Sequence, residues 1–173
     1  MIEKLELREA RPNDAPPIET LYLAAFPDED LLPLVRDLQG SSAVSLVGLV
    51  DNALVGHIVL TPCSVAGRPD KVALLGPLAI APDWQRQGIG SAIVRAGLRR
   101  LESDGMTHVY VLGDPAYYSR FGFEADDNVT PPYSLPDEWR GAWQSLRLSD
   151  DEQPLSGTLS VPQAWRRQKL WAP

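Results

Sequence analysis

The chain has 173 residues, of which 44% are hydrophobic, and its 16 Lys and Arg against 23 Asp and Glu give a formal charge of −7. This length and hydrophobic content predict one folded domain over residues 1–173 and exclude a mostly disordered chain. The negative charge argues against a nucleic-acid partner, because binding to a phosphate backbone depends on clustered Lys and Arg.

The amino-terminal half alternates strand and helix patterns. Strands are predicted where apolar residues alternate with polar ones or form short runs between turn residues; they cover Leu5–Arg8, Val44–Val50, Leu54–Leu60 and Val72–Ile80. Helices are predicted where proline or acidic residues precede spaced apolar side chains; they cover Pro12–Phe26 and Asp28–Leu38. Asp51 and Asn52 predict a tight hairpin turn between two of the strands.

The carboxyl-terminal half opens with an amphipathic helix between Gly88 and Gly105, because Ile89, Ile93 and Leu101 recur on one face. A short helix is expected at Pro115–Phe121. Further strands are expected at His108–Leu112, Ala142–Leu148 and Leu155–Val161. Residues 126–173 hold four of the five tryptophans and are expected to form a Trp- and Pro-rich part of the same domain. This order of elements predicts an α/β or α+β domain with a central mixed sheet.

The longest apolar runs are far shorter than the roughly 20 residues that cross a bilayer. The charged, alternating amino terminus is unlike a secretory signal, so we expect a cytoplasmic protein without a membrane partner. Cys63 is the one cysteine and is expected to be a buried, inert thiol. With two histidines, His57 and His108, the sequence gives no metal-ligand cluster, and we expect no metal.

The turn before the amphipathic helix is the most informative segment, reading Gln85-Arg86-Gln87-Gly88-Ile89-Gly90-Ser91. The first N–H groups of a helix lack intrahelical partners and lie at the positive end of its dipole, so this turn predicts an anion site beside Arg86. Alternatively, the two glycines only allow a tight turn. A dinucleotide fingerprint is excluded because it needs a third glycine where Ile93 stands. A P-loop is excluded because it needs Gly-Lys-Ser/Thr where Ile93-Val94-Arg95 stands.

These residues resemble the acetyl-CoA motif (Q/R-x-x-G-x-G/A) of the GNAT N-acetyltransferase superfamily. A second string, Tyr118-Ser119-Arg120-Phe121-Gly122-Phe123, resembles the Tyr-x-x-x-Gly-Phe segment of that fold. The longer string from Val111 to Phe123, with Gly56-His57-Ile58 and Leu75-Gly76-Pro77-Leu78, is similar to the bacterial YhbS-like branch. The resemblance spans residues 1 to 162 and implies a GNAT fold, with a mixed, mostly antiparallel sheet of about seven strands flanked by about four helices.

The resemblance implies an acetyl-CoA-dependent N-acetyltransferase that transfers acetyl to a primary amine by direct attack in a ternary complex. The backbone of the strand before the turn would pair with the pantetheine arm, and the N–H groups from Gln87 through Ser91 would hold the pyrophosphate. The implied cofactor-binding residues are Leu78, Ala79, Ile80, Gln85, Arg86, Gln87, Gly88, Ile89, Gly90, Ser91, Asp114 and Tyr117. Asp114 departs from the family pattern, in which many members carry Asn.

Tyr118 takes the position of the family's general acid. A phenol with a pKa of about 10 is protonated at neutral pH and can donate to the departing thiolate. Neighbouring Tyr117 takes the place of an aromatic that packs inward. Glu29 is the predicted base, and the alternatives are Asp28, Asp30, Asp114, His57 or a water chain. Carboxylates in such a loop are more often solvated surface acids, and a histidine on a central strand is more often a hydrogen-bonded core residue.

A different class of function, a catalytically silent CoA-binding module that regulates a partner, is the alternative, since exposed tryptophans favour interfaces. The tryptophans could also line a pocket for a cation or pack beneath the sheet. Dimerisation through carboxyl-terminal strands is compatible with the fold.

The charge is unevenly distributed along the chain. Residues 78–100 carry four Arg and one Asp, a charge of +3, whereas residues 1–77 and 101–173 each carry −5. This distribution fits an anionic donor at the basic segment and a cationic amine as acceptor.

Overall fold

The structure is a computed structural model that describes residues 4–65, 68–149 and 155–171. The chain divides into two compact units. The first unit comprises Met1–Leu60 and Gly76–Arg100, and the second comprises Thr61–Leu75 and Leu101–Pro173. The predicted anion-binding turn therefore belongs to the first unit and Tyr118 to the second. A single domain over residues 1–173, with 126–173 as its carboxyl-terminal part, stays a prediction.

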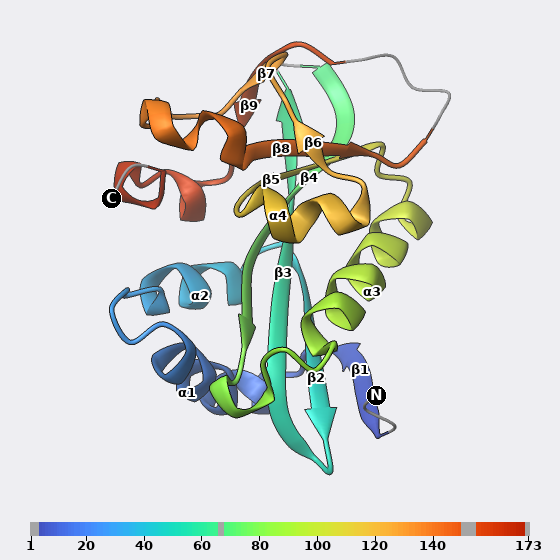
Figure 1. The fold of residues 1–173 in the computed structure, drawn as a ribbon, viewed down its shortest axis with the longest axis vertical. Helices are drawn as coiled ribbons and strands as arrows, with labels where there is room; N and C mark the ends of the chain where they lie inside the picture. The colour runs from blue at the N-terminus through green and yellow to red at the C-terminus, as the bar shows by residue number, and fades with distance from the viewer. Residues whose placement is uncertain (1–3, 66–67, 150–154, 172–173) are drawn as a thin grey trace. The chain divides into compact units, whose positions relative to one another are not determined.

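The sheet of the first unit has the strand order β1–β2–β3–β4 (Figure 1). The strands are β1 (Leu5–Glu9), β2 (Val44–Val50), β3 (Ala53–Val65) and β4 (Arg68–Ile80), of which β3 and β4 continue into the second unit. β2 is antiparallel to β1 and β3. Between β2 and β3, Asp51 and Asn52 have φ values of 50° and 67°, as in the two-residue turns whose twist suits a hairpin. The predicted hairpin and its turn are confirmed.

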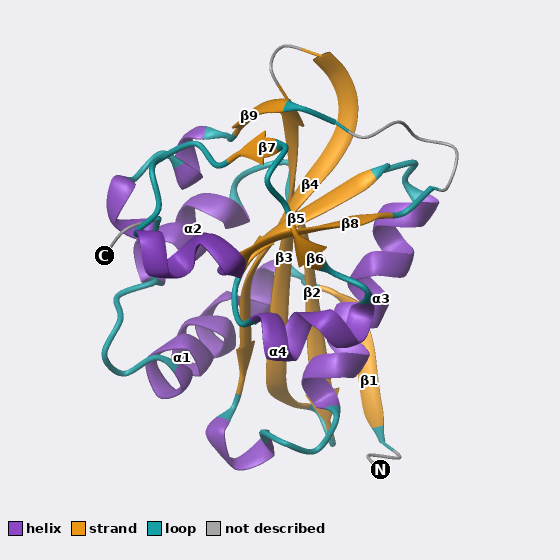
Figure 2. Ribbon diagram, turned by 45° about the horizontal axis from the view of Figure 1, so that its top comes forward, coloured by secondary structure: helices purple, strands orange, loops and turns teal. Residues whose placement is uncertain are grey.

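Helices α1 (Ala15–Ala25) and α2 (Leu32–Gln39) lie side by side in the first unit (Figure 2). The predicted start of the second helix at Asp28 is wrong. Pro33 lies in the first turn of α2, and the helix begins one residue before it. The N–H groups of a first turn make no intrahelical hydrogen bond, so a proline, which lacks an N–H, is tolerated there. Residues 28–30 consequently remain in the loop between the helices.

One hydrophobic cluster joins these helices to the sheet of their unit. Its buried members are Ile18, Leu21, Tyr22, Val35, Val47, Leu49 and Ala79. The third helix, α3 (Ile89–Ser103), follows the turn after β4 and ends before Gly105, as its apolar spacing predicts.

The second unit contains a mixed sheet. Its further strands are β5 (His108–Leu112), β6 (Glu124–Ala125), β7 (Val129–Thr130), β8 (Trp143–Arg147) and β9 (Gly157–Ser160). β5 pairs in parallel with β4 and antiparallel with β8, and β9 pairs with β3 and β7. All seven predicted strands are present, and β6 and β7 bring the strands in the described residues to nine. The described ranges contain four α-helices, of which the last is α4 (Pro115–Tyr118). Most of the strand pairs are antiparallel, so the predicted mixed, mostly antiparallel sheet flanked by helices is confirmed.

Three carboxyl-terminal tryptophans are core residues of the second unit. Trp143, Trp165 and Trp171 are all buried. Their indole N–H groups donate to internal acceptors, namely the Val129 carbonyl, the Thr61 hydroxyl and the Trp165 carbonyl, at 2.8, 3.1 and 3.0 Å. Of the predicted alternatives for these three residues, packing is therefore the one observed.

Candidate functional site

The predicted anion site is the turn that joins β4 to α3. The side-chain amide of Gln85 donates to the carbonyl of Ile80 at 3.1 Å, and that of Gln87 donates to the carbonyl of Asp83 at 3.1 Å. Both glutamines thus hold the turn in shape.

The backbone of this turn is open to a ligand. Gly88 has a φ of 88°, and a Cβ built on it would meet no atom within 4 Å. Arg86 is exposed and has a φ of 62°, a conformation that costs a non-glycine residue roughly 1–2 kcal/mol. The first main-chain bond of α3 joins the N–H of Ala92 to the carbonyl of Gly88. The N–H groups at the start of α3 are donors that an anionic group binds, and Arg86, three residues before Ile89, carries a positive charge in the same turn.

The strand before the turn carries a main-chain edge that β5 does not cover. β4 pairs with β5 at Val72–Leu74, and within the described ranges this ladder does not reach Leu78–Ile80. Ala79 is buried, whereas Leu78 and Ile80 are half-buried. An uncovered strand edge offers N–H and C=O groups to an extended chain that contains amides.

Tyr118 lies in α4 of the second unit and is buried, with 8% of the residue exposed. The rings of Tyr117, Phe121 and Phe123 pack around it at centroid distances of 5.0, 6.3 and 5.7 Å. Among the residues that the structure describes, none hydrogen-bonds to the Tyr118 hydroxyl. Burial, assisted by Tyr117, raises the pKa of this phenol. Leaving a buried polar group without a partner costs about 1–3 kcal/mol, so this hydroxyl is a candidate ligand contact.

The other predicted residues of α4 have internal roles as well. The carboxylate of Asp114 caps the helix by accepting the N–H of Ala116 at 2.9 Å. Tyr117 is half-buried, and the guanidinium of Arg120 lies 4.5 Å from its ring centroid. The expectation that Tyr117 is the inward-packing ring is wrong, because successive helical side chains point about 100° apart and Tyr118 takes the inward direction.

His57 is a core histidine rather than a base. Its side chain is 1% exposed, Nδ1 lies 2.8 Å from the hydroxyl of Tyr22, and Nε2 lies 2.6 Å from the hydroxyl of Ser45. Burial lowers the pKa of His57 to about 4. Both ring nitrogens are therefore engaged inside the first unit.

The carboxylates predicted as bases lie in the loop between α1 and α2. Asp28, Glu29 and Asp30 are all exposed there, and the N–H of Glu29 donates to the carbonyl of Phe26 at 3.3 Å. The role of Glu29 as base stays a prediction.

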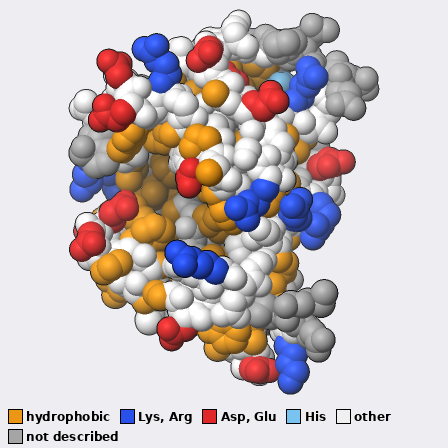
Figure 3. Space-filling model, in the orientation of Figure 1, with side chains coloured by type: hydrophobic (Ala, Val, Ile, Leu, Met, Phe, Trp, Pro, Cys, Tyr) orange, Lys and Arg blue, Asp and Glu red, His pale blue; other side chains and the backbone are white. Residues whose placement is uncertain are grey.

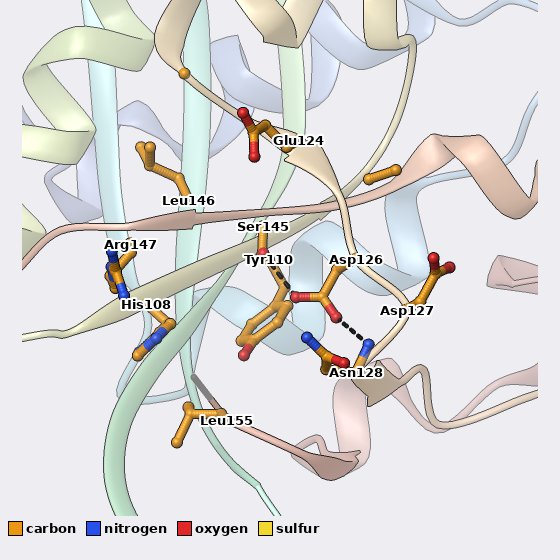
Figure 4. A pocket seen from close by; sticks show the side chains of 12 residues that line it. His108, Tyr110, Glu124, Asp126, Asp127, Asn128, Ser145, Leu146, Arg147 and Leu155 are labelled. Carbon is orange, nitrogen blue, oxygen red and sulfur yellow. Dashed lines mark hydrogen bonds between the residues drawn. The ribbon is translucent and has the colours of Figure 1, made fainter. Parts of the chain in front are cut away.

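A pocket of about 560 Å³ lies in the second unit beside β5, β6 and β8 (Figure 4). Asp126 points into it, and its carboxylate accepts the N–H groups of Asn128 and Val129 and the hydroxyl of Ser145, at 2.8, 2.8 and 2.6 Å. None of the predicted donor-binding or catalytic residues is among the described residues that line this pocket. Asp126 instead stabilises the loop between β6 and β7 through these hydrogen bonds.

Neither a metal centre nor a membrane segment is found in the part of the chain that the structure describes. No group of three or more His, Cys, Asp or Glu side chains there could hold a metal ion. Its helices are too short or too polar to cross a bilayer.

Basic and acidic side chains are interspersed on the face drawn in Figure 3.

Two residues without a predicted role contact the Tyr118 segment. Gly113 precedes α4, and Gln144 of β8 donates to the carbonyl of Gly113 at 3.1 Å. Gly113 belongs to the string from Val111 to Phe123, but the contact with Gln144 depends on a strand pairing that no local pattern indicates.

Comparison with known sequences identifies relatives over most of the chain. A family model described as "Acetyltransferase (GNAT) family" matches residues 7–123. The uncharacterized N-acetyltransferase YjhQ of Escherichia coli (strain K12) is 32% identical over 151 residues, covering 84% of this chain and 83% of the relative. The uncharacterized N-acetyltransferase YhbS of the same strain is 35% identical over 147 residues, covering 81% and 85%.

Solved structures show the same fold. Escherichia coli YhbS in complex with CoA has a TM-score of 0.87 at 29% identity, covering 95% of this chain and 93% of the other. A GNAT family acetyltransferase from Brucella melitensis in complex with acetyl-CoA has a TM-score of 0.77 at 28% identity, covering 93% and 97%.

Proposed function

This chain belongs to the GNAT family of acetyltransferases, and we propose that it transfers the acetyl group of acetyl-CoA to a primary amine by direct attack in a ternary complex. The amine nitrogen attacks the thioester carbonyl carbon, the C–S bond breaks, and the CoA thiolate leaves. One proton must leave the amine and another must reach the thiolate. The relatives crystallised with CoA and acetyl-CoA support acetyl-CoA as the donor.

For the donor, the proposal assigns the pyrophosphate to the start of α3. The open space above Gly88 would let a phosphate approach the main-chain N–H groups of residues 87–91, and Arg86 would add a positive charge. The uncovered edge of β4 at Leu78–Ile80 suits the amide groups of the pantetheine arm. Asp114 and Tyr117, in the second unit, are the remaining proposed donor contacts.

The observation that carries the acid assignment is the buried Tyr118 hydroxyl, which has no hydrogen-bond partner in the described chain. A phenol carries its proton at neutral pH and can donate it to the departing thiolate. Burial raises the pKa of Tyr118, which keeps the proton on the free enzyme and also makes the phenol a weaker acid. Tyr22 differs, because its hydroxyl lies 2.8 Å from a ring nitrogen of His57.

Direct attack is supported by the state of Cys63. Burial raises the pKa of this thiol to about 12, so it supplies almost no thiolate for an acyl-cysteine intermediate. For the base the proposal names Glu29, an exposed carboxylate. Glu29→Gln should lower turnover, with Asp28→Asn and Asp30→Asn as matched controls in the same loop. Lower turnover in Asp28→Asn or Asp30→Asn alone would move the role of base to that carboxylate. Wild-type turnover in all three variants would exclude these carboxylates and leave Asp114 or a water chain as the base.

Release of free CoA over a panel of amines tests the proposal. Tyr118→Phe should lower kcat by about 10²-fold or more, as loss of a general acid does, while calorimetry shows unchanged acetyl-CoA affinity. Tyr133→Phe, which removes the hydroxyl of a half-buried tyrosine that the proposal does not use, is the control and should keep most of the turnover. Wild-type turnover in Tyr118→Phe would remove Tyr118 as the acid.

The alternative, a silent CoA-binding module, depends on exposed tryptophans at an interface. Burial of Trp143, Trp165 and Trp171 weakens that reason, and Trp139, the fourth tryptophan of this segment, is half-buried. Calorimetry still separates the two functions, because acetyl-CoA binding without turnover on any amine or protein lysine would favour the silent module.

A further inference from the structure

The ring of Tyr118 lies directly on the main chain of Gly113. A Cβ built on Gly113 would be 2.5 Å from Cε2 of the tyrosine ring, closer than real Cβ atoms approach other atoms, and 3.0 Å from Cδ2, which is a tight contact. Gly113 does not have a positive φ, so the close approach of the ring, and not a left-handed backbone, requires glycine here.

The main chain of Gly113 is fixed on both sides of its Cα. Its N–H donates to the carbonyl of Ala142 at 3.0 Å, and its carbonyl accepts the side-chain amide of Gln144 at 3.1 Å. The same amide also donates to the carbonyl of Ala142 at 3.3 Å. Gln144 is 1% exposed, so this clamp is shielded from competing water.

The tyrosine ring is confined on its other sides too. The rings of Tyr117, Phe121 and Phe123 pack around it, and its own N–H donates to the carbonyl of Asp114 at 3.0 Å. Because the N–H and the carbonyl of Gly113 are both hydrogen-bonded, we expect a methyl group at position 113 to displace the Tyr118 ring more than the main chain.

We infer that Gly113 and Gln144 are positioning residues that set the place of the Tyr118 hydroxyl: Gly113 provides the surface on which the ring lies, and Gln144 holds that surface still. This inference rests on the proposed function, in which Tyr118 is the general acid. Proton transfer depends on close and directed contact, and a displacement of about 1 Å can cost on the order of 10²-fold in rate.

Gly113→Ala is the direct test, and Gly141→Ala is its matched control, because a Cβ on Gly141 would meet no atom within 4 Å. Gly113→Ala should lower kcat at least about tenfold with unchanged acetyl-CoA affinity by calorimetry. Gly141→Ala should match wild type. In a Tyr118→Phe background, Gly113→Ala should cause no further loss, because the hydroxyl that it misplaces is already absent.

Gln144→Met is the second variant, since it keeps the length of the side chain and removes the amide donor. It should lower kcat when Tyr118 is present and have no further effect on Tyr118→Phe. This variant keeps the inference testable if Gly113→Ala fails to fold.

Equal losses from Gly113→Ala with and without the Tyr118→Phe change would indicate a merely structural role and overturn the inference. If Tyr118→Phe loses turnover while Gly113→Ala and Gln144→Met keep it, the inference fails and the proposed function stands. If Tyr118→Phe keeps wild-type turnover, the acid role and the inference fail together. A crystal structure of Gly113→Ala gives a readout independent of turnover, and an unmoved Tyr118 ring would likewise overturn the inference.

Discussion

The hydroxyl of Tyr22 lies 2.8 Å from Nδ1 of His57, which joins helix α1 to strand β3 inside the first unit. On the other side of the ring, the hydroxyl of Ser45 lies 2.6 Å from Nε2. A neutral imidazole has one donor and one acceptor, and a hydroxyl can fill either role, so the neutral ring satisfies both contacts. A charged ring would have two donors in a site that burial keeps from water.

Folding stability should therefore fall as the pH drops from about 6.5 towards about 4. Burial lowers the pKa of His57 from 6.5 to about 4, so the unfolded chain binds a proton in this range that the folded chain does not. The contribution of neutral His57 to the free energy of unfolding is fully present above pH 6.5, the pKa of histidine in the unfolded chain. It amounts to roughly 3 kcal/mol relative to a pH below about 4. Urea unfolding across this range should show a falling midpoint, and His57→Asn should flatten the slope. The same slope in that variant would contradict the assignment.

Asp14 should add an acid-sensitive contribution at lower pH. The Arg8 guanidinium, at 2.7 and 3.1 Å, and the N–H of Arg11, at 2.6 Å, lower the pKa of this carboxyl below 3.8. Its stabilisation is thus present above that value and lost as the pH falls through the folded pKa. Asp14→Asn should cost about 1–3 kcal/mol at neutral pH by urea unfolding.

The control for Asp14 is Asp137→Asn, which removes an exposed pair with Arg140 at 3.9 Å. Exposed ion pairs contribute at most about 1 kcal/mol, so its unfolding midpoint should stay close to wild type. Equal decreases in the free energy of unfolding of the two variants would show that the partly buried bonds of Asp14 stabilise the fold no more than an exposed ion pair does.

Gly88→Ala should weaken acetyl-CoA binding about tenfold, which corresponds to roughly 1.4 kcal/mol. The added methyl group would occupy the open space above the turn and would strain a backbone with a φ of 88°. Gly40→Ala is the matched control, because its Cβ also meets no atom within 4 Å and its φ is not positive. Calorimetry on both variants measures the effect, and an unchanged Kd for folded Gly88→Ala would place the pyrophosphate elsewhere.

Cys63 is half-buried, so the expectation of a fully buried thiol is wrong, but the thiol should still resist alkylation in the folded protein. Because burial raises the pKa of its thiol to about 12, its thiolate fraction near pH 8 is on the order of 10⁻⁴, whereas a free cysteine has a pKa of about 8.5. Iodoacetamide labelling followed by mass spectrometry should be at least about 10²-fold slower in buffer than in concentrated urea. Similar rates in both would show an accessible thiol.

The strands that the sequence predicts well are those with long apolar runs between turn residues. Val44–Val50 has both predicted ends, because a run of that length is bounded by polar residues and a turn. β6 and β7 are not predicted, because each has only two residues and so shows no periodic pattern. β3 extends beyond Leu60 through Pro62, a residue that argues against a strand, and pairs with β9 at Ser64 and Val65.

The candidate site is predictable where it is local and unpredictable where it depends on pairing. The glycine-containing turn before α3 is visible in the sequence because its geometry is set by adjacent residues. Which of Tyr117 and Tyr118 is buried depends on the direction in which α4 packs. Gln144 meets Gly113 through the pairing of β5 with β8, a contact between residues 31 positions apart that no local pattern encodes.

The buried tryptophans have a spectroscopic consequence. Trp171 packs against Trp143 and Trp165 with ring centroids 5.8 and 6.0 Å apart, all in the second unit, whereas Trp84 lies in the first. Tryptophan emission therefore follows mainly the second unit, while far-ultraviolet circular dichroism averages over both. Coincident melting curves from the two signals would indicate concerted unfolding, and separate curves would resolve the two units optically without any added label.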